Sequence, residues 1–284
     1  ATVIKLLITD LDDTLYSWIG FFIPAFYGMV DELSLILKKP KQTLIQEYRK
    51  INQEKGSVEY PYATLDLPSV KAIYPDKTQK ELLTILDPAF HKFNSIRKKT
   101  LHLYPNVKET LTKIVEMGIK VVGYTDSAEE NGFYRLKKLD IADFFYHVYV
   151  SESQFKQLSK LPSSEKTQIE LGKKPNPKLI KKICERESIS LKETIYLGDS
   201  ITKDIYMAKL AGVTSILCQY PCDPVVQEEL YSKLIAISHW TPFDYQKEAT
   251  IKAICHKENI HPDYIIHAFD ELLAVIHKLN KLTS

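Results

Sequence analysis

The chain has 284 residues, of which 44% are hydrophobic and 26% are charged. These values are ordinary for a soluble globular protein and argue against a disordered chain or a small disulfide-stapled scaffold. The 38 basic and 36 acidic side chains leave a formal net charge of +2, which argues against a nucleic-acid partner, because nucleic-acid-binding domains are usually strongly basic. At about 150 residues per domain, this length predicts one or two domains.

The N-terminal segment predicts a buried strand and no export signal. Residues 3–9 form a short apolar run rich in β-branched side chains, and Asp10 interrupts any longer apolar stretch. The uncharged stretch 14–30 contains Pro24 and is shorter than the roughly 20 residues that a membrane span needs. We therefore expect buried protein there, no membrane partner and a cytoplasmic location. The four cysteines are too scattered for a disulfide framework, so we expect core thiols in a reducing compartment.

The region 17–99 has apolar side chains at three- and four-residue spacing, which predicts helices. Prolines punctuate it into four or five helices: Pro40, Pro61, Pro68, Pro75 and Pro88. From residue 101 strand and helix patterns alternate, which predicts an α/β fold with a parallel sheet covered on both faces. We therefore predict a core of residues 1–16 and 100–284 and an inserted helical domain of residues 17–99.

The later elements are expected in a regular order. The expected strands lie at 119–125, 145–150, 194–197, 214–218 and 264–267. The expected helices lie at 106–117, 128–139, from 177 onward, at 203–211 and at 269–279. The polar segment 152–172 predicts a loop or short surface helices. Residues 221–262 contain two helical patterns, at 225–235 and 246–257, which have no predicted place in the fold.

Carboxylates follow two of the expected strands. Asp10 and Asp12 come directly after the first strand, and their spacing lets both face the crevice beyond the strand ends, where open α/β sheets bind ligands. Gly198 and Asp199 follow the strand 194–197, and Asp204 comes five residues later, at the start of a helix. Neighbouring carboxylates repel one another, and Mg²⁺ favours such hard oxygen ligands. The pattern indicates a Mg²⁺ site; solvated turns with Asp caps are the alternative.

Hydroxyl and ammonium groups lie at the end of another expected strand and just before an expected helix. Thr125 ends an expected strand and precedes Asp126 and Ser127, and a hydroxyl there can hydrogen-bond an anionic ligand. Lys173 and Lys174 lie just before the helix that opens at residue 177, where an anion is well accommodated. A charged surface loop is the alternative interpretation of these lysines.

Taken in chain order, these four signals resemble the motifs of the haloacid dehalogenase superfamily of aspartate-nucleophile phosphohydrolases. The motifs are Asp-x-Asp at 10–12, Thr125, Lys-Pro-x-Pro at 174–177 and Gly-Asp-Ser-x-x-x-Asp at 198–204. The resemblance implies a three-layer α/β Rossmann-like core and an α-helical cap at 17–99. Residues 10–16 also resemble the pyrimidine 5′-nucleotidase-like branch.

The resemblance implies roles for the acidic residues. Asp10 would be the nucleophile that forms an aspartyl-phosphate. Asp12 would protonate the leaving oxygen and then activate water. Asp10 and Asp199, with the backbone carbonyl of Asp12, would bind Mg²⁺. Asp204 would orient the motif lysine or support the metal shell.

The resemblance also implies roles for the groups that bind the substrate. Thr125 and Lys174 would hold the transferring phosphoryl group and stabilise its charge. Asp126 and Ser127 would be further substrate contacts. The Lys-Pro-x-Pro register favours Lys174 over Lys173.

The expected function is Mg²⁺-dependent hydrolysis of a small phosphomonoester, either a nucleotide or a sugar phosphate, under a closing cap. Asp12 disfavours dehalogenation, because cleavage of a carbon–halogen bond needs no protonated leaving oxygen. A phosphomutase is one alternative that the four motifs do not separate from a phosphatase. The other is a non-catalytic interaction protein, which would be marked by a lost nucleophile or metal carboxylate; neither is lost here.

Overall fold

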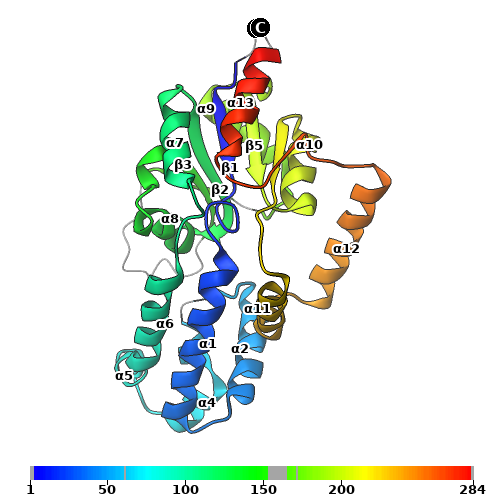
Figure 1. Ribbon diagram of the computed structural model, residues 1–284. Coiled ribbons are helices and arrows are strands. Elements are labelled where there is room, and N and C mark those ends of the chain that lie inside the picture. The colour runs from blue at the N-terminus through cyan, green and yellow to red at the C-terminus, as the bar shows by residue number, and fades with distance from the viewer. Residues whose placement is uncertain (1–2, 61, 153–164, 171, 283–284) are drawn as a thin grey trace. The chain divides into compact units, whose positions relative to one another are not determined.

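The computed structural model describes residues 3–60, 62–152, 165–170 and 172–282. The chain forms two compact units (Figure 1). The first, which we call the sheet unit, comprises Ala1–Ser17, His102–Pro221 and Glu248–Ser284. The second, which we call the helical unit, comprises Trp18–Leu101 and Cys222–Lys247.

The sheet unit contains one sheet of seven parallel strands in the order β4-β3-β2-β1-β5-β6-β7. The central strand β1 pairs with β2 and β5, so that Thr9 lies opposite Gly123 on one side and Leu197 on the other. The carboxyl ends of these three strands therefore lie side by side, and the predicted α/β fold is confirmed. The strands are β1 (Leu6–Thr9), β2 (Lys120–Ala128), β3 (Phe145–Ser151), β4 (Thr167–Glu170), β5 (Thr194–Gly198), β6 (Thr214–Cys218) and β7 (Tyr264–Ile266).

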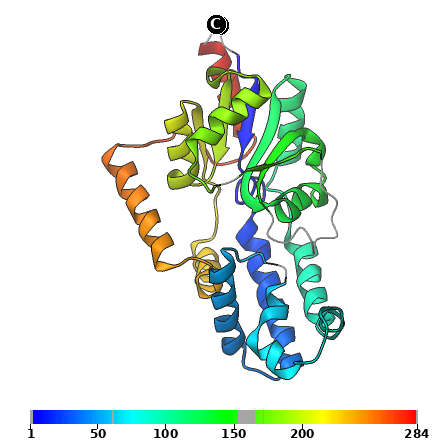
Figure 2. The same cartoon turned by 180° about the vertical axis from the view of Figure 1, so that it is seen from behind.

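Helices cover both faces of this sheet (Figures 1 and 2). On one face Leu179, Ile183 and Met207, from α9 and α10, join buried side chains of the central strands in one hydrophobic core. On the opposite face α7 and α13 lie together. The helices of the unit are α7 (Val107–Glu116), α8 (Glu129–Lys138), α9 (Pro177–Glu187), α10 (Tyr206–Ala211) and α13 (Glu271–Leu282), with single turns at Ala142–Phe144, Leu191–Glu193 and Ile201–Ile205.

The helical unit is built around the long apolar helix α1, which packs along α6. The ring of Phe22 lies 5.8 Å from that of Phe26 and 5.9 Å from that of Phe93, centroid to centroid. Because this core needs apolar residues on several sides of α1, the helix is rich in phenylalanine and isoleucine. The helices are α1 (Trp18–Leu37), α2 (Lys41–Lys55), α3 (Ala63–Asp66), α4 (Pro68–Ile73), α5 (Gln79–Ile85), α6 (Asp87–Thr100) and α11 (Pro224–Ile237).

Three of the predicted prolines stand at helix starts, whereas Pro75 lies in the turn between α4 and α5. Pro40 is the N-cap of α2, Pro68 is the first residue of α4 and Pro88 lies in the first turn of α6, where the missing N–H has no intrahelical partner to lose. Pro61 lies outside the described residues. The segment contains six helices among its described residues, rather than the four or five expected.

Among the described residues, α1 is one helix that is long and apolar enough to cross a membrane. However, 56% of its most apolar window is buried inside the structure, as expected of a core helix. This agrees with the prediction that residues 14–30 are buried protein.

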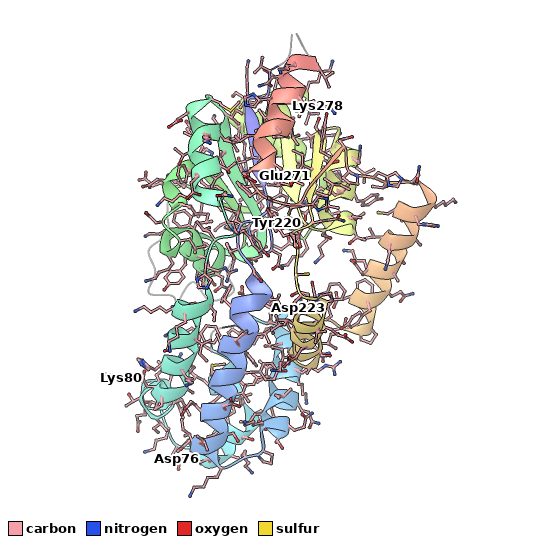
Figure 3. The ribbon with its side chains drawn as sticks, viewed as in Figure 1. Asp76, Lys80, Tyr220, Asp223, Glu271 and Lys278 are labelled. Atoms are coloured by element: carbon pink, nitrogen blue, oxygen red, sulfur yellow. The ribbon has the colours of Figure 1, made fainter. Side chains whose placement is uncertain are left out.

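The segment 222–247 departs from the predicted division of the chain, because it groups with the helical unit. The side-chain amide of Asn52 on α2 donates to the carbonyl of Ile237 at 2.8 Å, and the Tyr27 hydroxyl of α1 donates to the carbonyl of Lys233 at 2.7 Å. Figure 3 labels Tyr220, near the end of one piece of the sheet unit, and Asp223, the N-cap of α11. The next helix, α12 (Pro242–Lys257), begins in the helical unit and ends in the sheet unit.

Two smaller expectations were wrong. The polar segment 152–172, predicted as a loop or short helices, contains the edge strand β4. Since an edge strand is covered on few sides and only Glu170 of β4 is buried, its sequence lacks the apolar run that identifies the central strands; residues 153–164 and 171 lie outside the described residues. Cys222 is exposed, unlike the other three cysteines, so it is not a core thiol.

Candidate active site

The loop after β1 is held tightly against the neighbouring strand. The backbone N–H of Asp10 donates to the carbonyl of Leu197 at 2.8 Å, which extends the pairing of β1 with β5 by one residue. Leu15 donates back to the carbonyl of Leu11 at 2.9 Å, and Asp13 adopts a positive φ of 62° that lets the chain turn. The side chain of Asp10 is thereby fixed at the carboxyl edge of the sheet, buried among its neighbours.

Gly198 at the end of β5 makes room for a second carboxylate. A Cβ atom at this position would lie 2.3 Å from Cγ of Asp204, so that only glycine allows Asp204 to approach the strand end. Asp204 accepts hydrogen bonds from the Tyr196 hydroxyl at 2.6 Å and from the backbone N–H of Ser200 at 3.1 Å. The Gly-Asp-Ser motif therefore folds back on itself, and Asp204 is buried.

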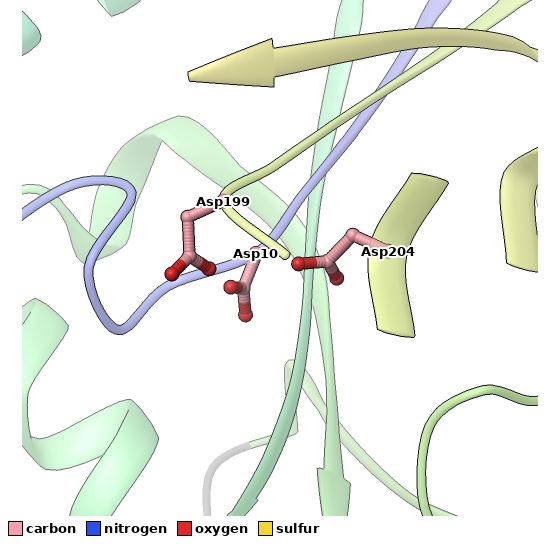
Figure 4. Close-up of side chains that lie close together, drawn as sticks. All are labelled: Asp10, Asp199 and Asp204. Carbon is pink, nitrogen blue, oxygen red and sulfur yellow. The ribbon is translucent and has the colours of Figure 1, made fainter. Parts of the chain in front are cut away.

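Three carboxylates point toward one another at this edge (Figure 4). One oxygen from each of Asp10, Asp199 and Asp204 lies within 4.8 Å of the others. Burial, together with the charges of Asp204 and Asp199, raises the pKa of Asp10 well above its ordinary value, although Lys174 acts in the opposite direction. Desolvation in this crowded cluster, followed by the charge of Asp204, raises the pKa of Asp199 to about 7. The cluster thus holds more negative charge than its own cation offsets.

Lys174 is the cation inside this cluster. Its side chain is only 4% exposed, and its ammonium lies 2.9 Å from Oδ1 of Asp10 and 3.0 Å from Oδ1 of Asp204. Burial opposes the charged ammonium, but these two carboxylates raise the pKa of Lys174 well above its ordinary value. The next helix, α9, begins close by because the side chain of Asn176 caps the N–H of Leu179 at 3.3 Å.

Lys173 lies apart from the carboxylates. It is exposed, and its ammonium donates to the backbone carbonyl of Asp126 at 3.0 Å. Lys174, the lysine that the Lys-Pro-x-Pro register favours, is therefore the one that contacts Asp10.

The end of β2 brings polar groups to the same edge of the sheet. The pairing of β2 with β3 is irregular between Tyr124 and Ala128, and such an irregularity redirects side chains from the regular alternation of a strand. Thr125 is buried, and its hydroxyl accepts the backbone N–H of Ser127 at 3.0 Å. The carboxylate of Asp126 accepts the backbone N–H of Lys174 at 3.1 Å, so this side chain ties two loops of the site together.

Asp12 faces a different set of partners from Asp10. Its carboxylate accepts hydrogen bonds from the hydroxyl of Tyr16 at 2.6 Å, from the hydroxyl of Ser127 at 2.9 Å and from the guanidinium of Arg135 at 3.1 Å. Arg135 is a residue of this site that the sequence did not single out. The signal for Arg135 was weak: it adjoins buried Leu136 on α8, whereas the following lysines of that helix are exposed.

The donor set fits a small divalent cation. Asp10 and Asp199 provide hard carboxylate oxygens of the kind that Mg²⁺ prefers, and the raised pKa values of both are what a cation would reverse. Asp204 is less suited to be a ligand, because Lys174, Tyr196 and Ser200 already occupy its oxygens.

Comparisons with known proteins identify the family and the fold. The model of a family described as haloacid dehalogenase-like hydrolase matches residues 7–218. The chain is 27% identical over 220 residues to a glyceraldehyde 3-phosphate phosphatase of Methanopyrus kandleri, covering 75% of this chain and 83% of that protein. It is 32% identical over 122 residues to a phosphoglycolate phosphatase of Vibrio vulnificus, covering 43% and 46%. The crystal structure of a 2-haloacid dehalogenase from Pseudomonas syringae shares the fold, with a TM-score of 0.57, 20% identity and coverage of 97% of this chain and 99% of that chain.

Proposed function

The chain belongs to the haloacid dehalogenase-like hydrolase family, and we propose that it is a Mg²⁺-dependent phosphatase that hydrolyses a small phosphomonoester through an aspartyl-phosphate. One observation carries the proposal: the ammonium of Lys174 bridges Asp10 and Asp204 in a cluster that also contains Asp199. In this proposal Asp10 is both the nucleophile and a metal ligand, Asp199 is the second metal carboxylate, and Lys174 is a fixed cation for the phosphoryl oxygens. These are the functional groups that phosphoryl transfer to an aspartate requires.

In the first half-reaction a carboxylate oxygen of Asp10 attacks phosphorus. The bond from phosphorus to the ester oxygen breaks, and Asp12 gives that oxygen a proton as it leaves. In the second half-reaction Asp12 takes a proton from water, whose oxygen attacks the aspartyl-phosphate. The phosphorus–oxygen bond to Asp10 breaks, which releases inorganic phosphate and restores the carboxylate.

The other side chains hold and neutralise the phosphoryl group. Lys174 and the hydroxyl of Thr125 would bind its oxygens, with Ser127 as a further contact, and Asp204 would keep Lys174 in place. Asp10, Asp199 and the backbone carbonyl of Asp12 would hold Mg²⁺, whose charge offsets the repulsion between phosphate and carboxylate when it is bound. Asp126 is already engaged with the backbone of Lys174, so we assign it to shaping the loop in addition to contacting the substrate.

The substrate class that we propose is a small phosphorylated metabolite. The relatives named above are a glyceraldehyde 3-phosphate phosphatase and a phosphoglycolate phosphatase, which supports substrates of two or three carbons alongside the nucleotide and sugar phosphates expected from the sequence. The helical unit, with Cys222–Lys247 added to the predicted 17–99, is the cap in this proposal. An enzyme of such metabolites would work in the cytoplasm.

The test is phosphate release from a panel of esters, with Mg²⁺ and with EDTA. The panel contains glyceraldehyde 3-phosphate, phosphoglycolate, nucleoside monophosphates and sugar monophosphates. We expect phosphate release that depends on Mg²⁺ and is lost in Asp10→Asn. This variant should still unfold cooperatively on heating, as a folded chain does. Release by Asp10→Asn at the unaltered rate would exclude Asp10 as nucleophile, and formation of an isomeric sugar phosphate without free phosphate would identify a phosphomutase instead.

A further inference from the structure

Arg135 is a charged side chain in the sheet unit that the mechanism above does not use. It lies on α8, and its side chain is only 5% exposed. Its Nη2 atom donates to both oxygens of Asp12, at 3.1 Å and 3.3 Å. A buried guanidinium is retained at a high desolvation cost unless its partner matches it closely, so this ion pair calls for an explanation beyond packing.

Tyr16 forms hydrogen bonds with both members of the ion pair. The hydroxyl of this fully buried tyrosine donates to Oδ1 of Asp12 at 2.6 Å and accepts from Nε of Arg135 at 3.1 Å. Asp12 and Tyr16 are also joined by a backbone bridge. Rotation of the Asp12 side chain would therefore break contacts with two buried partners at once, and the carboxylate is held in one orientation.

That orientation directs Asp12 toward the end of β2. Its Oδ2 accepts the hydroxyl of Ser127 at 2.9 Å, and the backbone N–H of Ser127 donates to the hydroxyl of Thr125 at 3.0 Å. In the proposed function Thr125 and Ser127 contact the phosphoryl group. The carboxylate of Asp12 is thus fixed beside the groups that hold the phosphoryl group, where a proton donor to the leaving oxygen is needed.

We propose that Arg135 is a positioning residue that fixes Asp12 for protonation of the leaving group. The proposal rests on the proposed function, in which Asp12 is the proton donor. Arg135 touches neither substrate nor metal in this role; it acts through Asp12, with Tyr16 as the second support. Its loss should therefore affect only those esters whose leaving oxygen needs a proton.

The leaving group separates this role from a merely structural one. An alkoxide leaves phosphorus poorly unless it is protonated, whereas p-nitrophenolate leaves without a proton. The ratio kcat/KM reports the steps up to departure of the leaving group, so it excludes the later activation of water by Asp12. We expect Arg135→Met to lower kcat/KM for an alkyl phosphate by about 10- to 100-fold, within the usual contribution of general acid catalysis, and to change kcat/KM for p-nitrophenyl phosphate by less than about threefold.

The experiment compares these two esters in a double-mutant cycle. The variants are Arg135→Met, Asp12→Asn and the pair together, each with Mg²⁺ and each checked by thermal unfolding. In the Asp12→Asn background, Arg135→Met should cause no further selective loss, because the group that it positions is no longer a proton donor. Arg135→Lys should recover part of the alkyl phosphate rate. Arg186→Met, on α9 and paired with Glu170 far along the sheet, is the control for loss of an arginine.

Should Arg135→Met fail to fold, Tyr16→Phe removes a single hydroxyl from the same network and should give a smaller loss with the same selectivity. Equal losses for both esters in the folded variants, or a gain with the alkyl ester, would overturn the positioning role and leave the phosphatase standing. Failure of the unaltered chain to hydrolyse either ester would overturn the proposed function and, with it, this inference.

Discussion

At the scale of the residue, the position of Lys174 depends on three residues that do not themselves bind phosphate. Asp204 holds the ammonium, Tyr196 holds Asp204, and Gly198 leaves the space in which Asp204 sits. None of the three has to touch the substrate, yet each sets where the cation of the site lies. Substitutions at these positions should therefore reduce turnover through displaced charge.

Gly198→Ala should lower kcat by about tenfold or more, because a Cβ atom 2.3 Å from Cγ of Asp204 must push that carboxylate away, and displacements near 1 Å cost this much or more at catalytic sites. Phosphate release under saturating ester measures the effect. Gly28→Ala is the matched control: its Cβ would lie equally close, at 2.3 Å, to Cδ1 of Ile96, the mobile end of a side chain that can rotate. A fully active Gly198→Ala would contradict the close-approach argument.

Tyr196 and Tyr124 offer a matched pair at Lys174. Both rings lie near its ammonium, at 5.8 Å and 4.8 Å, but the Tyr196 hydroxyl donates to Asp204, whereas the Tyr124 hydroxyl has no hydrogen-bond partner among the described residues. Tyr196→Phe should lower the free energy of unfolding by about 1.5–3 kcal/mol, the range for a hydrogen bond to a charged group. Tyr124→Phe should be neutral or stabilising. Chemical denaturation measures both, and equal losses would show that the hydrogen bond from Tyr196 to Asp204 adds no stability of its own.

At the scale of the element, most helices and strands could be predicted from local pattern. The buried strand β5 is a continuous apolar run. Just beyond the end of α7 lies Gly118, which has a positive φ of 81°, as helix termination favours. The strand β4 could not be recognised, because an edge strand with one buried residue has no such run. The assignment of α11 to the helical unit could not be predicted from local sequence patterns either, because it depends on partners nearly two hundred residues away in sequence.

A substitution at Asn52 tests the assignment of α11 to the helical unit. Its amide binds the carbonyl of Ile237 on α11, and both residues are buried, so Asn52→Ala leaves a buried carbonyl without this donor. We expect a loss of about 1–3 kcal/mol in the free energy of unfolding, measured by urea denaturation. Glu54→Ala, on the exposed side of the same helix, should change little. If both variants unfold alike, α11 is not tied to α2 in solution.

At the scale of the whole molecule, the active site is a product of strand order. The parallel sheet brings β2, β1 and β5 together, so that Thr125, Asp10 and Asp199 lie at one edge of the sheet although they are widely separated along the chain. This convergence concentrates negative charge at one edge, with Lys174 as the buried cation within it. The stability of the metal-free protein should therefore depend on pH.

The sign follows from the raised pKa values of Asp10 and Asp199, the latter about 7 against an ordinary value of 3.8. Between pH 3.8 and about pH 7 the folded chain binds more protons at these carboxylates than the unfolded chain does. Their contribution to the free energy of unfolding therefore falls as the pH rises. In EDTA the Tm should be lower at about pH 8 than at about pH 5, and Mg²⁺ should raise it at the higher pH. Asp199→Asn should flatten both responses; a variant that keeps them unchanged would show that Asp199 is not their source.

The amino-acid sequence was enough to predict the alternation of strands and helices, the helical region 17–99, and the acidic, hydroxyl and lysine positions at one edge of the sheet. These follow from local periodicity and from residue types at strand ends, which short segments carry on their own. The tertiary structure was needed to show that α11 joins the helical unit and that Arg135 holds Asp12. Each of these depends on contacts between distant segments, whose geometry is set by the packing of the sheet and its helices and leaves no periodic trace along the chain.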